Sequence, residues 1–335
     1  MTGECRDRVR WPVSTSAFMR SYGARHSRRA SARGAILAVV WLLLFAVPAA
    51  AAGVVPLNEN EPVVRESIYN YLIISRSGSV VRLRRLENGA TVSAIDLAEP
   101  RRQMIPYTAT MFGAAMIEPN PSEVFNIGLG AGALNRLIEP SFPAASLTTV
   151  EVDPMMVEVA RTYTGFQPDD RDKIVIEDGR RHLLKVGGKW DWIMLDAYVR
   201  RSQVPPQFTT VEFYKLVASR LSPNGVFVDN LHFGTELFQS NVKTLLASFP
   251  QVAFLTVPNS GNIIALAVTY KTPSLVQQIR EADIGRLPRL DAWNVDLASI
   301  KDNLVAPDRF PVPRGTKILT DDFAPAEILD TRPMR

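Results

Sequence analysis

The chain has 335 residues, of which 46% are hydrophobic and 21% are charged, and its formal net charge is +4. This balance excludes a collagen-like chain and a wholly disordered one. The single cysteine, Cys5, lies near the N-terminus, so the rest of the chain has no cysteine for a disulfide, a zinc site or a nucleophile. With only three histidines, we predict no metal. The length suits one large domain or two moderate ones.

The excess of positively charged residues lies in the N-terminal segment. Residues 1–34 contain eight arginines and two acids, a net charge of +6, whereas the rest of the chain holds 30 bases against 32 acids, a net charge of −2. The globular part is therefore slightly acidic, and we predict no nucleic-acid partner.

An uncharged apolar run from Ala35 to Ala52 follows these arginines and ends in small residues. A basic segment, an apolar core and small residues predict a signal peptide, and the run also reaches the lower limit for an uncleaved signal anchor in the membrane. We expect residues 1–52 to be this leader, and the body to be exported to the cell envelope or membrane-anchored. A misassigned start site would leave the protein cytoplasmic. A buried helix of the fold is the alternative interpretation.

Residues 53–68 resemble a linker, and short strands follow. Alternating β-branched and aromatic residues with Ser-Gly and Asn-Gly turns predict a small antiparallel β unit from Tyr69 to about Asp96. We expect a helix over Tyr107–Ile117 to connect this unit to the rest, so that residues 69–115 form a first domain.

Strands and helices then alternate over residues 116–270, which predicts a mainly parallel sheet covered by helices. The expected strands lie within SEVFNIGLGAG, SLTTVEVD, KIVIEDG, WDWIMLDAY, GVFVDNL, VAFLTV and NIIALAVTY, and the expected helices within PMMVEVARTY, VEFYKLVASRL and SNVKTLLASF. Ligands of such sheets bind at the carboxyl ends of the strands. Residues 271–335 form a tail with one expected helix, from Ser274 to about Ile284.

Four of the expected parallel strands end in residues that suit a nucleoside ligand. A glycine-rich turn lets the backbone approach a ligand and presents free amide groups at a helix N-terminus. We expect the carboxylate of Glu151 to accept hydrogen bonds from both ribose hydroxyls and that of Asp178 to accept an adenine amino hydrogen. The carboxylate of Asp196 would face the reactive part of the ligand. These candidates are, in chain order, Gly128, Gly130 and Gly132, then Glu151, then Asp178 with Gly179, and finally Asp196.

Each of these signals has a structural alternative. A tight turn uses glycine without any ligand, and Asp178 would also cap the next helix; for Asp153 the capping role fits better than a ligand role. The glycine-rich turn and Glu151 match a dinucleotide-binding fingerprint as well, so a nicotinamide enzyme competes. The preceding β unit and the placement of Asp178 and Asp196 favour an adenosyl-sulfonium pocket instead.

Three further polar residues are expected near this site. His182 lies in the helix after Asp178, and we expect it at the surface or in packing. His232 and Asn230 follow the fifth strand and are candidates for the pocket mouth.

The chain resembles the spermidine synthase (polyamine aminopropyltransferase) family in VFNIGLGAGALNRL, LTTVEVDPMMVEVARTY, VIEDGRRHLL and WDWIMLDAY, followed by VPPQFTTVEFYKLVASRLSPNGVFVDNL. The ending LTDDFAPAEIL is similar to the spermidine-synthase-like branch. The resemblance covers roughly residues 69–270. It implies an α/β fold, with a Rossmann-like class I methyltransferase-type sheet preceded by a small antiparallel β domain and, here, by the N-terminal hydrophobic segment. It also implies a homodimer.

The resemblance assigns roles to the candidate residues. The glycines, Glu151, Asp178 and Gly179 would hold the adenosyl part of decarboxylated S-adenosylmethionine, the co-substrate. Asp196 matches the first acid of an Asp-x-x-Asp motif that deprotonates and orients an attacking amine, and Tyr107 falls at a substrate-side tyrosine. An ammonium group has no lone pair, so it must lose a proton before it displaces the sulfonium. The implied function is aminopropyl transfer to a small-molecule amine in polyamine biosynthesis.

Two acids of that family are replaced here. The aspartate that holds the aminopropyl amine is Ala131, and the second acid of Asp-x-x-Asp is Val199. Asp321 and Asp322 would restore acidity if the tail folds over the cleft; otherwise they form an exposed turn. Two alternatives therefore stay open, an S-adenosylmethionine-dependent methyltransferase with a non-polyamine acceptor and a non-catalytic envelope binding protein.

Overall fold

The computed structural model describes residues 54–198, 204–235, 237–310 and 312–323. The chain divides into two compact units, Met1–Pro48 and Ala49–Arg335, and the described residues all belong to the second. The predicted leader over residues 1–52 lies outside the described residues. Within the described part of the chain, no helix is long and apolar enough to span a membrane.

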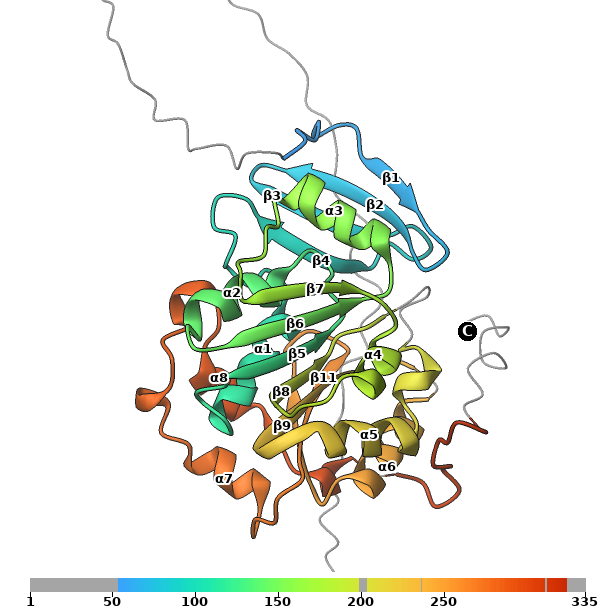
Figure 1. Cartoon of the computed structure of the whole chain (residues 1–335), viewed down its shortest axis with the longest axis vertical. Coiled ribbons are helices and arrows are strands. Elements are labelled where there is room, and N and C mark those ends of the chain that lie inside the picture. The colour runs from blue at the N-terminus through green and yellow to red at the C-terminus, as the bar shows by residue number, and fades with distance from the viewer. Residues whose placement is uncertain (1–53, 199–203, 236, 311, 324–335) are drawn as a thin grey trace, which may run out of the picture. The chain divides into compact units, whose positions relative to one another are not determined.

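An antiparallel four-stranded sheet opens the described chain (Figure 1). Alternation along the strands buries one face, with Leu72 and Ile74 on the second strand and Val81 and Leu83 on the third. The strands, in sheet order, are β1 (Val63–Glu66), β2 (Tyr71–Ser77), β3 (Val80–Arg85) and β4 (Thr91–Asp96).

The predicted β unit is present, but β1 belongs to residues 53–68, which the sequence predicts as a linker. The four residues of β1 alternate between intermediate and exposed positions, so their pattern is too short and too polar to indicate a strand. Pairing with β2, from Val63 opposite Ile74 to Glu66 opposite Tyr71, decides the conformation.

The connecting helix is shorter than the predicted Tyr107–Ile117. Helix α1 spans Pro106–Met111, and a 3-10 helix continues it over Phe112–Met116. At Gly113 a side-chain carbon would lie 2.5 Å from Leu255 Cδ1, so the segment packs directly against the main sheet.

The main sheet has eight strands in the order β12-β10-β11-β9-β8-β5-β6-β7. Neighbours from β7 to β9 are parallel, and the pairs β9–β11, β11–β10 and β10–β12 are antiparallel. The strands are β5 (Glu123–Ile127), β6 (Ser146–Glu151), β7 (Asp172–Ile176), β8 (Trp190–Leu195), β9 (Leu221–His232), β10 (Gln251–Thr256), β11 (Asn262–Val268) and β12 (Leu304–Val305).

The five parallel strands, counted along the chain, lie in the order 3-2-1-4-5, which is a Rossmann-like order. This confirms the predicted α/β class with its preceding antiparallel sheet. The strand order reverses between β5 and β8, and ligands of open α/β sheets bind at the carboxyl ends beside such a reversal. The tail, residues 271–335, also contributes: Leu304 and Val305 of β12 pair with β10.

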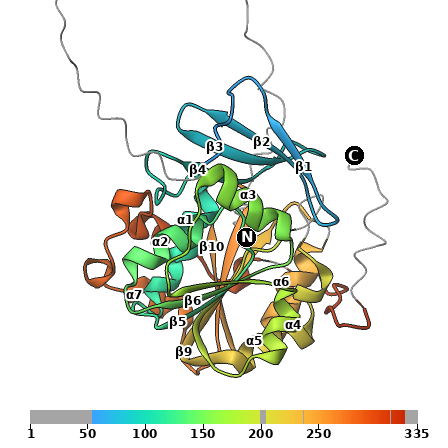
Figure 2. The ribbon, with the colours of Figure 1, turned by 45° about the horizontal axis from the view of Figure 1, so that its top comes forward.

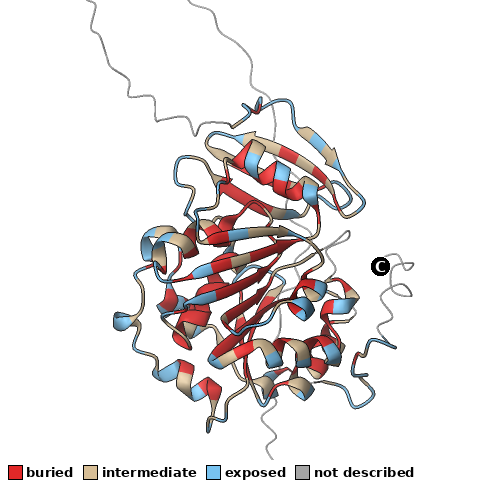
Figure 3. Ribbon diagram, in the orientation of Figure 1, coloured by how far each residue is buried: buried red, intermediate tan, exposed pale blue. Residues whose placement is uncertain are grey.

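Helices cover both faces of the main sheet (Figures 1 and 2). Along β8, Trp192 and Met194 face the core under α1, α2, α7 and α8, whereas Ile193 and Leu195 face the core under α4, α5 and α6. The central strands are accordingly buried (Figure 3). The helices are α2 (Ala133–Ser141), α3 (Pro154–Thr164), α4 (Gly179–Lys185), α5 (Val211–Arg220), α6 (Phe238–Ser248), α7 (Leu275–Glu281) and α8 (Leu297–Asp302). Short 3-10 helices span Pro206–Phe208, Ile284–Arg286, Asp291–Trp293 and Pro307–Arg309.

The small sheet packs on α3 and on the start of α2. Its buried face forms one apolar cluster with Met156, Val159 and Tyr163 of α3 and with Ala131 and Ala133. The small sheet therefore lies beside the carboxyl ends of the parallel strands and forms a wall of the space above them.

Candidate functional site

A cavity of about 570 Å³ lies between the carboxyl ends of the parallel strands and the small sheet. This volume is typical of sites for small molecules. The cavity brings together seven of the eight predicted site residues, namely Tyr107, Gly128, Gly130, Glu151, Asp178, Gly179 and Asp196.

The turn after β5 depends on Gly128. Its φ is +101°, and a side-chain carbon there would lie 2.3 Å from the carbonyl oxygen of Asp196. Only glycine allows the backbones after β5 and β8 to approach this closely. The turn thus places Asp196 beside the glycine-rich loop.

Gly132 has a different role from the predicted ligand contact. It is the N-cap of α2 with a φ of +79°, and a side-chain carbon there would lie 2.4 Å from the ring of Phe166. Gly132 is not part of the cavity lining. Gly132 lets the loop pack on Phe166, and its predicted ligand contact stays a prediction.

Glu151 is held in place by backbone amides. Its Oε2 accepts a hydrogen bond from the N–H of Leu129 and its Oε1 from the N–H of Asp153, each at 2.9 Å. Burial raises the pKa of Glu151, while these two hydrogen bonds oppose the rise. Each carboxylate oxygen keeps a second lone pair, so Glu151 can still accept ligand hydroxyls.

Asp178 caps the next helix and also lines the cavity. Its Oδ1 accepts the N–H of Arg181 at 2.8 Å and so caps α4, while its Oδ2 accepts from Gln207 Nε2 at 3.3 Å at the cavity wall. Asp153 caps α3 through the N–H of Met155, as its sequence position suggested, and lies outside the cavity lining.

Asp196 lines the cavity from the end of β8, which lies across β5 from the strands that carry Glu151 and Asp178. Asn230 Nδ2 donates to its Oδ1 at 2.8 Å. The Tyr107 hydroxyl donates to the carbonyl oxygen of Val92 at 3.1 Å and lies close enough to Asp196 to lower the pKa of its carboxyl group. Burial raises the pKa of Asp196 to about 6, opposed by Asn230, Tyr107 and the positive charge of Arg85. Such a carboxylate is ionised at pH 7 yet can accept a proton.

A chain of hydrogen bonds fixes the orientation of Asn230. Ser260 Oγ donates to Asn262 Oδ1 at 2.6 Å, and Asn262 Nδ2 donates to Asn230 Oδ1 at 2.9 Å. The remaining amide group of Asn230 is therefore directed at Asp196. Sequence reasoning found Asn230 but missed Ser260 and Asn262, because they reach the site through the β10–β11 hairpin, which pairs antiparallel with β9.

Sequence reasoning also missed Arg85. This arginine is 3% exposed and lines the cavity from the end of β3. Burial lowers its pKa, while Glu87, Tyr107, Tyr198 and Asp196 oppose that shift. A signal existed in the sequence, because Arg85 falls on the same alternate face of the strand as the buried Val81 and Leu83.

The two histidines of the described chain behave differently. His182 is packed against the ring of Phe125 and lies 2.9 Å from Glu177 Oε2, in line with a packing role. His232 lines the cavity, accepts the N–H of Gly234 at its Nδ1, and has a pKa lowered by burial. Among the residues that the structure describes, no group of three or more histidine, cysteine or acidic side chains could hold a metal ion.

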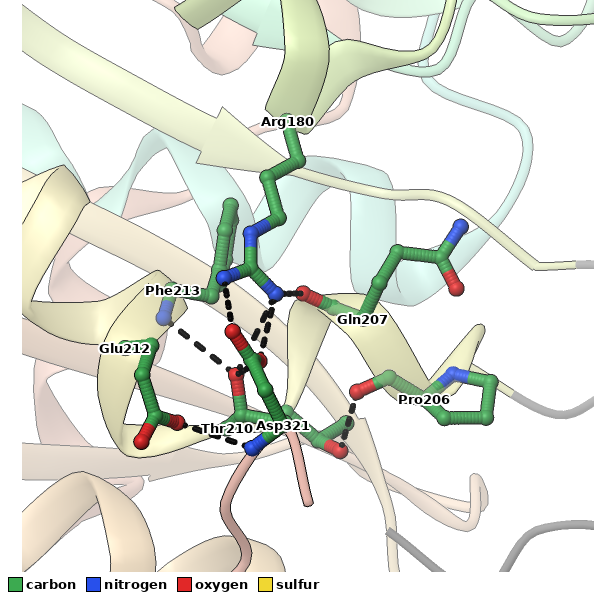
Figure 4. A network of polar contacts seen from close by, with 8 residues as sticks. Arg180, Pro206, Gln207, Thr210, Glu212, Phe213 and Asp321 are labelled. Carbon is green, nitrogen blue, oxygen red and sulfur yellow. Dashed lines mark hydrogen bonds and ion pairs between the residues drawn. The ribbon is translucent and has the colours of Figure 1, made fainter. Parts of the chain in front are cut away.

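Within the described residues, Asp321 and Asp322 of the tail do not supply acidity to the cavity. Arg180 Nη1 and Nη2 donate to the two carboxylate oxygens of Asp321 at 2.7 and 2.6 Å, and Thr210 Oγ1 donates to Asp321 Oδ1 at 2.7 Å (Figure 4). Asp322 is exposed, and neither acid lines the cavity. The expectation that they replace the missing family acids is therefore wrong, because Arg180 already neutralises Asp321. Arg180 also donates to the carbonyl oxygen of Gln207, a cavity-lining residue. Through Arg180, Asp321 of the tail is therefore connected to the cavity wall.

Asp321→Asn is expected to lower the free energy of unfolding at pH 7 by at most about 1 kcal/mol, because the Asp321 side chain is 44% exposed and solvent screens the pair. Arg180 lowers the pKa of Asp321, so the stabilisation is present above the ordinary value of 3.8 and is lost as the pH falls below it. Urea unfolding at pH 7 and pH 3 tests this, with Asp322→Asn as the matched control. Equal losses in the two variants at pH 7 would contradict it.

The fold and the site together define the chain as a Rossmann-like protein of the class I methyltransferase type, with a small-molecule cavity at the reversal of strand order. The family model described as "Spermine/spermidine synthase domain" matches residues 104–276, more than half of the chain. The chain belongs to the spermine/spermidine synthase family.

Curated relatives include two kinds of transferase. The polyamine aminopropyltransferase of Chromobacterium violaceum is 32% identical over 208 residues, covering 61% of this chain and 78% of that protein. The human eEF1A lysine and N-terminal methyltransferase is 33% identical over 144 residues, covering 40% of this chain and 21% of that protein.

Solved structures share the fold. A probable spermidine synthase from Corynebacterium glutamicum is 20% identical, with a TM-score of 0.58, and the match covers 82% of this chain and 99% of that one. A spermidine synthase in complex with the transition-state analogue AdoDATO is also 20% identical, with a TM-score of 0.57 and coverage of 76% and 87%.

Proposed function

We propose that the protein transfers an aminopropyl group from decarboxylated S-adenosylmethionine to an amine. The observation that carries this proposal is Asp196, a carboxylate whose pKa is raised to about 6 at one end of a ligand-sized cavity. Glu151 and Asp178, which suit an adenosyl group, line the same cavity beyond the glycine turn after β5. Membership of the spermine/spermidine synthase family supports the type of reaction.

The adenosyl end is proposed to bind through acceptor atoms and backbone. Glu151 accepts the two ribose hydroxyls with the lone pairs that Leu129 and Asp153 leave free. Asp178 accepts the adenine amino hydrogen with Oδ2, where Gln207 makes a longer bond of 3.3 Å. The backbone of Gly128 and Gly130 approaches the ligand without side chains.

In the proposed reaction Asp196 takes a proton from the ammonium group of the acceptor. The freed lone pair on nitrogen attacks the aminopropyl carbon that is bonded to the sulfonium sulfur. A C–N bond forms as the bond between this carbon and sulfur breaks. The electron pair of that bond stays on sulfur, and 5′-methylthioadenosine leaves as a neutral thioether. Asn230 holds the carboxylate in place during this step, and the binding of both reactants side by side supplies much of the acceleration.

Methyl transfer from S-adenosylmethionine is the second candidate. The presence of Ala131 favours methyl transfer. In the family that the chain resembles, this position carries the aspartate that holds the amine of the aminopropyl group. Ala131 is fully buried, and its N–H donates to Ser93 Oγ at 3.1 Å, so it offers the ligand no charge. Methyl transfer to a good nucleophile depends less on dedicated acids.

Glu151→Ala is expected to weaken binding of 5′-methylthioadenosine by about 10- to 100-fold, since hydrogen bonds to a charged group contribute about 1.5–3 kcal/mol. Isothermal titration calorimetry on the full chain measures this. Glu158→Ala, on the exposed side of α3, is the control and should bind like the wild type. No heat from the wild type with either 5′-methylthioadenosine or S-adenosylhomocysteine would overturn the proposed function.

A further inference from the structure

The part of the tail that carries Asp321 is anchored to helices α5 and α6. The side chain of Leu319 is buried, its N–H donates to Thr244 Oγ1, and its carbonyl oxygen accepts the N–H of Val211, each at 2.9 Å. Two residues further on, the N–H of Asp321 donates to Glu212 Oε2 at 3.0 Å. The backbone of Asp321 therefore has a fixed place beside the start of α5 (Figure 4).

The side chain of Asp321 fixes the guanidinium of Arg180. Arg180 Nη1 and Nη2 donate to its two carboxylate oxygens, and Thr210 Oγ1 donates to one of them at 2.7 Å (Figure 4). From this position Arg180 Nη1 also donates to the carbonyl oxygen of Gln207 at 3.1 Å. A bidentate pair defines the plane of a guanidinium, so the direction of the bond to Gln207 depends on Asp321.

Gln207 in turn orients Asp178. It belongs to the 3-10 helix Pro206–Phe208 and lines the cavity together with Asp178. Gln207 Nε2 donates to Asp178 Oδ2 at 3.3 Å, and the N–H of Arg181 donates to Asp178 Oδ1 at 2.8 Å. These two bonds hold the two oxygens of the carboxylate from different sides, and Oδ2 keeps a lone pair that can accept an amino hydrogen of a ligand.

We propose that Asp321 is a positioning residue for recognition of the purine amino group of the ligand. It acts through Arg180 and Gln207, which hold Asp178 in the orientation that accepts this group. The inference rests on the proposed function, because it assumes that an adenosyl compound binds with its amino group at Asp178. A 6-oxopurine would present an acceptor oxygen to the carboxylate. A fixed Asp178 rejects such a base, and a carboxylate that can turn away rejects it less.

Calorimetry on the full chain with two nucleosides measures this selectivity. 5′-Methylthioadenosine and 5′-methylthioinosine differ in an amino group against an oxygen on the purine ring. We expect the wild type to favour the amino form by about tenfold or more, since the site accepts a hydrogen from one base and faces an acceptor in the other. Asp321→Asn leaves one of the two Arg180 nitrogens without an acceptor and should reduce this preference by about threefold or more.

Two further variants test the path through Arg180. Arg180→Lys keeps the charge but loses the planar fork, so it should reduce the preference as Asp321→Asn does. Asp322→Asn is the matched control, because Asp322 is exposed and lies next to Asp321 without lining the cavity, and it should keep the wild-type preference.

A tail that only stabilises the fold would change the affinity for both nucleosides by the same factor. Glu151→Ala provides this reference, because loss of the ribose contacts should weaken both nucleosides equally and leave the preference unchanged. Urea unfolding at pH 7 shows that Asp321→Asn is folded in the assay. If Asp321→Asn leaves the preference unchanged, or if the wild type binds both nucleosides equally, this inference is overturned while the proposed function stands. If the wild type binds neither nucleoside nor S-adenosylhomocysteine, the proposed function fails and the inference fails with it.

Discussion

Asp196→Asn is expected to slow group transfer by about 10²- to 10⁴-fold, the range for loss of a positioned general base. Asparagine keeps the shape of the side chain but cannot accept a proton from an ammonium group. Binding of 5′-methylthioadenosine should persist, because Glu151 and Asp178 hold the adenosyl end. Release of 5′-methylthioadenosine from decarboxylated S-adenosylmethionine, with 1,4-diaminobutane as acceptor, measures the rate.

The pH dependence of the reaction rate tests whether Asp196 is the general base. Because Asp196 must be ionised to act and its pKa is about 6, the wild-type rate should rise with pH through this value. Alkylammonium groups titrate near 10, so they do not produce a rise there. Asn230→Ala removes a hydrogen bond that favours the ionised carboxylate, and should move the rise to higher pH. A full rate in Asp196→Asn, with the rise unchanged, would exclude Asp196 as the base.

Stability provides the control for this variant. The folded-state pKa of Asp196 lies above the ordinary value of 3.8, so the folded protein holds a proton that the unfolded chain releases between about pH 4 and pH 6. Stability is therefore lost as the pH rises through this window. Asp196→Asn removes the effect and should be at least as stable as the wild type at pH 7. A slower reaction in a protein of undiminished stability is then a loss of chemistry.

The sequence predicted those parts of the site that lie within one strand and the turn after it. Gly128 and Asp196 directly follow β5 and β8, Glu151 is the last residue of β6, and Asp178 lies two residues after β7. Parallel strands bring their carboxyl ends to one edge. Their convergence therefore follows from the alternation of strands and helices. Asp178 also shows that a helix cap and a cavity residue need not be exclusive alternatives.

The remaining part of the site depends on contacts between segments far apart in the chain. Asn262 reaches Asn230 across an antiparallel pair, and Asp321 meets Arg180 across 141 residues, so no local pattern indicates either contact. Arg85 is an intermediate case. The alternation along its strand predicts that the side chain is buried, but it does not predict that the side chain faces the cavity. The short strands β1 and β12 were missed because pairing, not composition, defines them.

Gly128→Ala is the second prediction with a large expected effect. Alanine at this position would have to adopt a left-handed backbone conformation, which costs about 1–2 kcal/mol for a residue with a side chain. It would also lie 2.3 Å from the carbonyl oxygen of Asp196, and overpacking of this kind costs about 1–3 kcal/mol. We expect the free energy of unfolding to fall by about 2–5 kcal/mol. Since backbone atoms on both sides must move apart, the glycine turn and Asp196 should also lose their relative placement.

Gly78→Ala separates the two contributions. Gly78 has a φ of +59° in the β2–β3 hairpin, and no atom lies within 4 Å of a side-chain carbon built there, so this variant carries the backbone penalty without the clash. Urea unfolding should show a loss of about 1–2 kcal/mol for Gly78→Ala and a larger loss for Gly128→Ala. Calorimetry with 5′-methylthioadenosine should show wild-type affinity for the first and weakened binding for the second. Equal effects of the two substitutions on stability and on binding would mean that the close approach after β5 and β8 does not hold the site together.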